Sequence, residues 1–260
     1  MRPLVYLSLA LLLIANTAEV TASDKAKEKR WADQIADVVM VGDAVWLEAG
    51  QDKFLGLYTE ASDGPKGAAI IMHGIGVHPD WPDVILPLRS QLPEQGWATL
   101  SIQMPVLHNE ANPAEYKPLF SEVAPRINSA IKFLKNKGYK NLVLIGHSLG
   151  TEMGVYYLVT DKKAGENITS FVITSMSPGS EAIPGKPLID WLKEVPVPML
   201  DLYGTEHERA TEGAKARLPI IKSKKGSEQK AIAGTGHFFQ GKNEELVKTI
   251  SDWISEYEKK

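Results

Sequence analysis

The sequence has no cysteine among its 260 residues, so no disulfide stabilises the fold and no cysteine can carry a lipid anchor. It also lacks a basic excess, since 29 Lys and Arg residues stand against 32 Asp and Glu residues, for a net charge of −3. Proteins that bind nucleic acid usually present a basic face, so this balance argues against such a partner. Stability must therefore come from buried apolar surface in a large, layered domain.

Long apolar runs are missing as well, apart from one at the N-terminus. Met1 and Arg2 precede an uncharged apolar run, Leu4–Ile14, that is too short to span a bilayer comfortably. Val20-Thr21-Ala22 follows the small-x-small pattern of a cleavage site. We therefore predict a signal peptide over residues 1–22, with Ala18 as a less favoured cleavage point and an uncleaved anchor as the alternative. The mature protein would be exported, without a membrane span, and we expect the bacterial periplasm.

The rest of the chain alternates short apolar runs with helical patterns. A β-hairpin is predicted over residues 43–61, and a helix capped by Ser121 and another after Asn243 show apolar residues at helical spacing. The remaining apolar runs are typical of strands buried on both faces; they lie at residues 67–72, 98–102, 142–145, 171–174, 197–202 and 231–233. No internal repeat or low-complexity linker is found. The pattern predicts a single α/β domain, residues 23–260, with a mostly parallel sheet and helices on both faces.

The strongest local signal is Gly-His-Ser-Leu-Gly, which lies between the strand 142–145 and a helix that begins near Leu149. This is the G-x-S-x-G turn of a nucleophilic serine in its expected context, and it predicts Ser148 as the nucleophile. The turn is so tight that side chains at Gly146 and Gly150 would collide with neighbouring backbone. The backbone N–H of Leu149 would donate to a developing oxyanion.

Two further motifs supply what a serine nucleophile needs. His73-Gly74-Ile75-Gly76 follows the strand 67–72 directly, and its glycines let backbone approach a substrate, so the Ile75 N–H is the predicted second oxyanion donor. A serine hydroxyl also needs a base. His237 follows the last predicted strand and is the predicted base, in the chain order serine, acid, histidine.

The acid is harder to assign. The strand 197–202 is followed by a turn in which an aspartate is usual three residues after the glycine, but this sequence has His207 there. Glu206 is the predicted acid, and Glu208, Asp201 and the more remote Glu181 are the alternatives. All six histidines are predicted to lie near the carboxyl edge of the sheet, where ligands collect in such folds.

With these residues in place, the sequence resembles the α/β-hydrolase superfamily over nearly all of its mature length. The segments MHGIGVHPDWPDVILPLRSQLPEQGWATLSIQMP and PMLDLYGTE resemble a narrower group of exported bacterial α/β-hydrolase-like proteins of unknown function. The resemblance implies a core sheet of the eight-stranded type, a serine nucleophile at Ser148 and a histidine base at His237. It implies no settled substrate.

Three functions follow as hypotheses. The first is a metal-independent serine hydrolase without a cofactor, acting on a small-molecule ester or related acyl substrate, with the segment 106–120 as part of a cap over the site. The second is a non-enzymatic binding or assembly module that keeps this fold. The third, a metal-dependent hydrolase using His73, His78 and Asp80, is disfavoured because no HExxH-type spacing is present.

Overall fold

The computed structural model describes residues 22–62, 64–179 and 182–256. Apart from Ala22, the predicted signal peptide lies outside the described residues, as does the candidate acid Glu181. Within the described part of the chain, no helix combines the length and apolar character needed to cross a membrane.

The centre of the molecule is one eight-stranded sheet with the order β1-β2-β4-β3-β5-β6-β7-β8. The hairpin β1–β2 is antiparallel and β2 pairs antiparallel with β4, whereas all the other pairs are parallel. The strands are β1 (Asp43–Ala49), β2 (Asp52–Thr59), β3 (Gly67–Met72), β4 (Trp97–Ile102), β5 (Leu142–His147), β6 (Ser170–Thr174), β7 (Met199–Gly204) and β8 (Glu228–Ile232). The mostly parallel sheet predicted from the sequence is confirmed.

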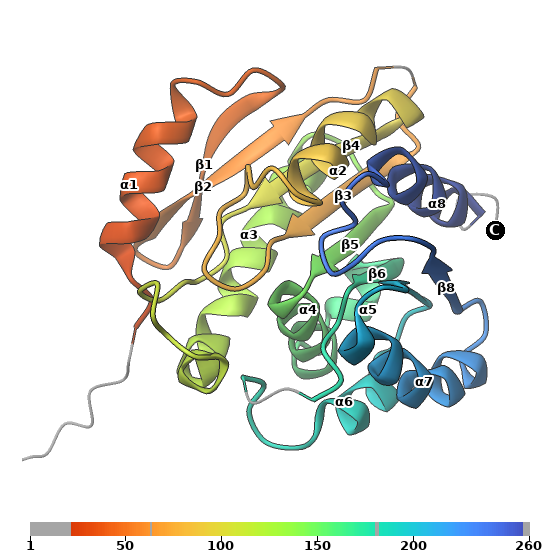
Figure 1. The fold of residues 1–260 in the computed structure, drawn as a ribbon. Coiled ribbons are helices and arrows are strands. Elements are labelled where there is room, and N and C mark those ends of the chain that lie inside the picture. The colour runs from red at the N-terminus through yellow and green to blue at the C-terminus, as the bar shows by residue number, and fades with distance from the viewer. Residues whose placement is uncertain (1–21, 63, 180–181, 257–260) are drawn as a thin grey trace, which may run out of the picture.

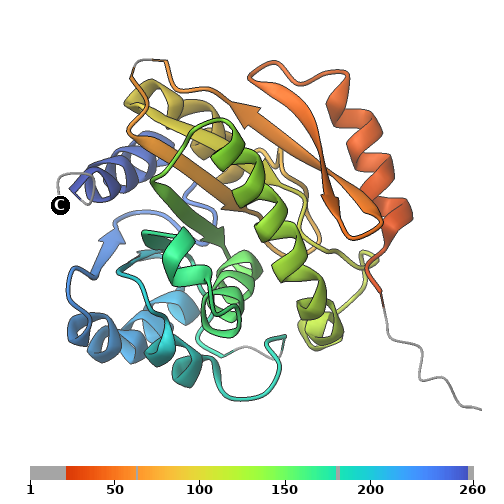
Figure 2. The same cartoon turned by 180° about the vertical axis from the view of Figure 1, so that it is seen from behind.

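Helices cover both faces of this sheet (Figures 1 and 2). One face is covered by α2 and α8, with α1 beside the hairpin, and the other by α3, α4, α6 and α7. The helices are α1 (Lys25–Ala36), α2 (Ile85–Gln91), α3 (Val123–Asn136), α4 (Leu149–Thr160), α5 (Ala164–Asn167), α6 (Leu188–Glu194), α7 (Glu208–Ser223) and α8 (Asn243–Glu256), with 3₁₀ segments η1 (Pro93–Gln95) and η2 (Pro113–Glu122).

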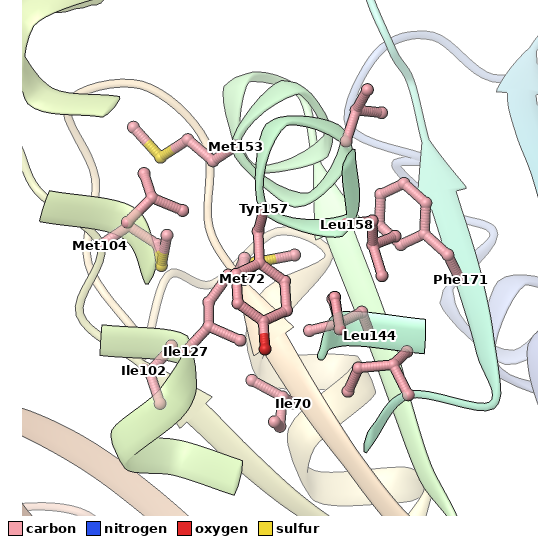
Figure 3. Close-up of a cluster of buried hydrophobic side chains, with 14 of the residues drawn as sticks. Ile70, Met72, Ile102, Met104, Ile127, Leu144, Met153, Tyr157, Leu158 and Phe171 are labelled. Atoms are coloured by element: carbon pink, nitrogen blue, oxygen red, sulfur yellow. The ribbon is translucent and has the colours of Figure 1, made fainter. Parts of the chain in front are cut away.

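The central strands are apolar throughout because both of their faces are covered. In β3, Ile70 and Met72 pack into the core under α3 and α4, whereas Ile71 packs under α2 and α8. Figure 3 shows the first of these cores, where Met153 and Tyr157 of α4 pack among side chains from the sheet and α3. This packing holds α4, and with it the turn before it, against the sheet.

Two element boundaries differ from the sequence-based prediction. The helix α3 does not begin with a Ser121 cap, because η2 runs directly into it; the Ser121 hydroxyl donates to the Pro118 carbonyl at 3.0 Å instead. The last strand lies at Glu228–Ile232 rather than at 231–233. It is an edge strand with mostly polar or exposed residues, so its apolar run marks only its end.

Candidate active site

Ser148 lies at the turn between β5 and α4, as predicted. Its backbone has φ +52° and ψ −122°, a conformation that non-glycine residues rarely adopt and that indicates local strain. The following helix lacks a side-chain cap at Ser148, so the hydroxyl is not used to satisfy the helix N-terminus. The turn therefore presents the hydroxyl at the positive end of α4.

The glycines of the turn are required by space. A Cβ at Gly150 would lie 2.4 Å from the Met72 carbonyl oxygen and 2.6 Å from that of His73. At Gly146 it would lie 2.8 Å from backbone atoms of Gly150. These distances confirm the predicted collisions, which involve backbone atoms that cannot move aside.

A cavity of about 670 Å³ opens at this turn. Four of the five predicted site residues line it, namely Ser148, His237, Leu149 and Ile75, whereas Glu206 does not. The full lining is Ile75, Pro113, Ser148, Leu149, Glu152, Ser177, Gly179, His207, Arg209, His237 and Phe238. Pro113 brings part of the predicted cap segment to the cavity. The fold thus gathers the serine, the histidine and both predicted oxyanion donors around one space.

The His237 ring contacts two other imidazole rings. The centroid of the His237 ring is 4.9 Å from that of His147 and 5.3 Å from that of His207. Burial, with the neighbouring charge of His207 as a second cause, lowers the pKa of His237 to about 4. His237 is therefore neutral at physiological pH, the state that a general base requires.

The ring of His207 forms a hydrogen bond with the backbone at the start of α7. His207 caps α7, and its Nδ1 accepts a hydrogen bond from the Ala210 N–H at 3.1 Å. In the neutral ring the proton must then be on Nε2, which makes that nitrogen a donor. In this state His207 cannot accept a hydrogen bond from His237 in the way a carboxylate does.

None of the candidate acids Glu206, Glu208 and Asp201 lines the cavity. The Glu206 side chain is exposed, and its backbone N–H donates to the Thr235 carbonyl at 2.9 Å. Glu208 is exposed at the start of α7. Asp201 is fully buried and forms a two-point ion pair with Arg217 at 2.8 and 3.0 Å. Among the described residues, no hydrogen bond joins a carboxylate to the His237 ring.

His73 has a structural role. Its Nε2 lies 2.9 Å from both the Met104 N–H and the Gln103 amide nitrogen, while its Nδ1 lies 2.8 Å from the Gly74 carbonyl. Burial lowers its pKa to about 3, so the ring is neutral and donates through Nδ1. The lone pair on Nε2 is thereby occupied. Within the described segments, no group of three His, Cys, Asp or Glu side chains could hold a metal ion.

Sequence reasoning missed several cavity residues. Glu152 lies one helical turn after Ser148 on α4 and is buried, and its i+4 spacing from the nucleophile could have indicated its position. Ser177 follows β6, and Arg209 lies in the first turn of α7. Both follow carboxyl ends of strands, which is where the lining of such a site is expected.

The sequence matches the model of a family described as "Protein of unknown function (DUF3530)", over residues 3–125 and 117–256. No curated protein matches it.

Solved structures resemble the fold at low sequence identity. A dienelactone hydrolase from Anabaena variabilis has a TM-score of 0.66 and 17% identity, over 82% of this chain and 96% of that one. Est1E from Butyrivibrio proteoclasticus has a TM-score of 0.65 and 16% identity, over 84% and 99%. An esterase from Pyrococcus furiosus has a TM-score of 0.63 and 14% identity, over 85% and 93%. The predicted α/β-hydrolase fold is confirmed.

Proposed function

The chain belongs to the DUF3530 family, described as proteins of unknown function, and we propose that it is a serine hydrolase that cleaves an ester or related acyl bond. One observation carries the proposal: Ser148, in a strained turn at the start of α4, lines the same cavity as His237. The solved hydrolases and esterases with this fold are consistent with that chemistry.

The proposed reaction follows from the groups around the cavity. The Ser148 hydroxyl attacks the acyl carbon as His237 takes its proton, and the Leu149 and Ile75 N–H groups stabilise the oxyanion. His237 then returns the proton to the leaving group, and an acyl-enzyme remains on Ser148. Water, deprotonated by the same imidazole, releases the acid. No metal or cofactor takes part in these steps.

We propose that Ser148 and His237 work as a pair. Glu206 was the expected third member, but its exposed side chain makes no hydrogen bond to His237 among the described residues. Removal of the acid from a Ser-His-acid triad slows catalysis without abolishing it, so a pair without an acid would be slow rather than inactive. Glu206→Gln should then leave the rate within about twofold of wild type, because the exposed Glu206 side chain has no hydrogen bond to His237 to lose.

Labelling with a fluorophosphonate probe tests the nucleophile. The folded wild type should be labelled, and Ser148→Ala should abolish labelling. Ser177→Ala is the matched control, since Ser177 lines the same cavity and should keep wild-type labelling. His237→Gln should slow labelling by about 10²- to 10⁴-fold, the usual contribution of a general base. An unlabelled wild type, or labelling that survives Ser148→Ala, would refute the proposal.

The second candidate is a binding or assembly module in which turnover has been lost. Two observations favour a binding module. His207 faces His237 as a hydrogen-bond donor, and no carboxylate among the described residues accepts a hydrogen bond from the His237 ring. A panel of esters and thioesters separates the two functions. Turnover that depends on Ser148 excludes the binding module, whereas a stable co-purifying partner with no turnover across the panel supports it.

A further inference from the structure

The chain is fixed to the fold from the first residue after the predicted cleavage point. Ser23 is 5% exposed, its backbone N–H donates to Glu122 Oε1 at 2.9 Å, and its hydroxyl donates to Glu122 Oε2 at 2.7 Å. The next residue, Asp24, donates its N–H to the Val106 carbonyl at 2.7 Å and caps α1. Ala22, by contrast, is exposed.

Glu122 belongs to a cluster of ion pairs that contains more negative than positive charge. Glu122 pairs with Lys25 and Arg126, Arg126 also pairs with Glu28, and Lys25 also pairs with Asp52. Three carboxylates thus share two cations. The side chains of Arg126 and Glu28 are 2% and 7% exposed, so solvent screens this part of the cluster little. Lys25 and Asp52 are more exposed and more strongly screened, but in the less exposed part the Glu28 and Glu122 carboxylates share the charge of Arg126, and an unmatched charge there is costly.

We propose that cleavage after Ala22 supplies the missing cation, and that the resulting α-ammonium of Ser23 binds the Glu122 carboxylate as a structural ion pair. Hydrolysis breaks the Ala22–Ser23 peptide bond; water gives its hydroxyl to Ala22 and a proton to the Ser23 nitrogen, which takes a second proton from solvent. The nitrogen already lies at hydrogen-bonding distance from Glu122, so no rearrangement is required. Three cations then match three carboxylates.

The pair adds charge to a hydrogen bond that a neutral amide already makes. The acceptor is a carboxylate in both states, so the gain comes from the second charge. At this short distance the attraction between two unit charges exceeds the cost of partly removing the ammonium from water, and we expect a net gain of about tenfold in the folding equilibrium constant. The surroundings of Glu122 favour its charged form even before cleavage. Burial by itself would raise the pKa of Glu122, but the hydrogen bonds from Ser23 and Lys25 outweigh it and leave the pKa below its ordinary value.

This cluster is connected to the loop of the candidate oxyanion donor. Arg126 donates to the Gln103 carbonyl at 2.9 Å, and the Gln103 side chain lies 2.9 Å from Nε2 of His73. His73 is the first residue of the His-Gly-Ile-Gly loop. The proposed ion pair is therefore linked to that loop through Arg126 and Gln103. The proposal does not depend on the proposed catalytic function.

Unfolding of chains with defined N-termini tests the proposal. One chain begins at Ser23 and another at Thr21, each released from a fusion partner by a protease that leaves no extra residue. With Glu122 intact, we expect the Ser23 chain to have a folding constant about tenfold higher in urea titrations. With Glu122→Gln, the two chains should be equally stable. Acetylation of the Ser23 amine, with Glu122 intact, should remove the same tenfold advantage.

Three outcomes would overturn the proposal. Equal stability of the two chains with Glu122 intact shows that the ammonium forms no useful pair. An advantage that persists after acetylation or with Glu122→Gln shows that the two extra residues, rather than the charge, cause the difference. Expression of the full chain in a bacterium, followed by mass spectrometry of the exported protein, must give a chain that begins at Ser23; any other start removes the basis of the proposal.

Discussion

His207 occupies the place where an acid was expected, and its ring is committed to the start of α7. The Nδ1 atom accepts from Ala210 N–H, which leaves Nε2–H as a donor beside His237. A base that acts on Ser148 through Nε2 must carry its own proton on Nδ1, and a carboxylate favours that tautomer by accepting a hydrogen bond from Nδ1–H. His207 presents an N–H donor in place of a carboxylate, so it does not favour the tautomer of His237 with its proton on Nδ1.

Replacement of His207 by aspartate should therefore raise activity. Aspartate is a good helix cap, so α7 keeps its start, and the new carboxylate can accept from His237. We expect Ser148-dependent hydrolysis or labelling to be about 10- to 10³-fold faster, within the contribution measured for triad acids. The pKa of His237 should rise, because an opposite charge favours the imidazolium, and the acidic limb of the pH–rate profile should move to higher pH.

His207→Asn is the matched control, since asparagine caps the helix equally well without a charge. Equal rates and equal pH profiles for the aspartate and asparagine variants would show that this position does not influence the base.

At the scale of elements, β7 and α7 are joined by a buried ion pair. Asp201 of β7 is fully buried, and it accepts from Arg217 of α7 and from the Gln229 side chain of β8. Arg217 also donates to the Met176 carbonyl at 3.1 Å. The carboxylate thus has a structural role between the last two strands and the helix that covers them, and it does not line the cavity.

Asp201→Asn should destabilise the protein by about 3–5 kcal/mol, because it leaves the Arg217 charge buried without a counter-charge. The double variant Asp201→Leu with Arg217→Met should lose much less, since it removes both charges. Urea unfolding measures both, and Ser148 labelling of the folded fraction should be unchanged. Loss of labelling at unchanged stability would instead identify Asp201 as the acid.

At the scale of the whole molecule, the interior holds neutral imidazoles. Burial lowers the pKa of both His73 and His147 to about 3, and both rings lie on the buried carboxyl edge of the sheet. In the unfolded chain a histidine titrates near 6.5, so between these values the unfolded state binds more protons than the folded state. Stability must therefore fall as the pH drops through this window.

We expect the free energy of unfolding to fall by about 6 kcal/mol between pH 7 and pH 5, about 2 kcal/mol from each of His73, His147 and His237, since the pKa of His237 is lowered as well, to about 4. Most carboxylates do not titrate in this range, so the histidines dominate the change. Urea titrations at pH 7, 6 and 5 measure it. His147→Asn, which cannot titrate, should lose about a third of the pH dependence. A wild type that is equally stable at pH 7 and pH 5 would contradict this expectation.

Much of the architecture was predictable because it depends on local pattern. The apolar runs marked the buried strands, and glycines around Ser148 indicated a turn whose strained φ the structure confirms. The polar edge strand β8 was misplaced, since one covered face leaves a weak apolar signal. The start of α3 was misjudged because a preceding 3₁₀ segment made a cap unnecessary.

By itself, the sequence determined the layered fold, the serine turn and the candidate base, because each depends on residue types within a few positions of one another. The tertiary structure alone decided that Asp201 pairs with Arg217, that the Glu206 side chain is exposed and does not line the cavity, and that Ser23 contacts Glu122. Those pairings depend on where side chains distant along the chain point once the sheet and helices have packed. Spacing along the chain carries no information about that direction.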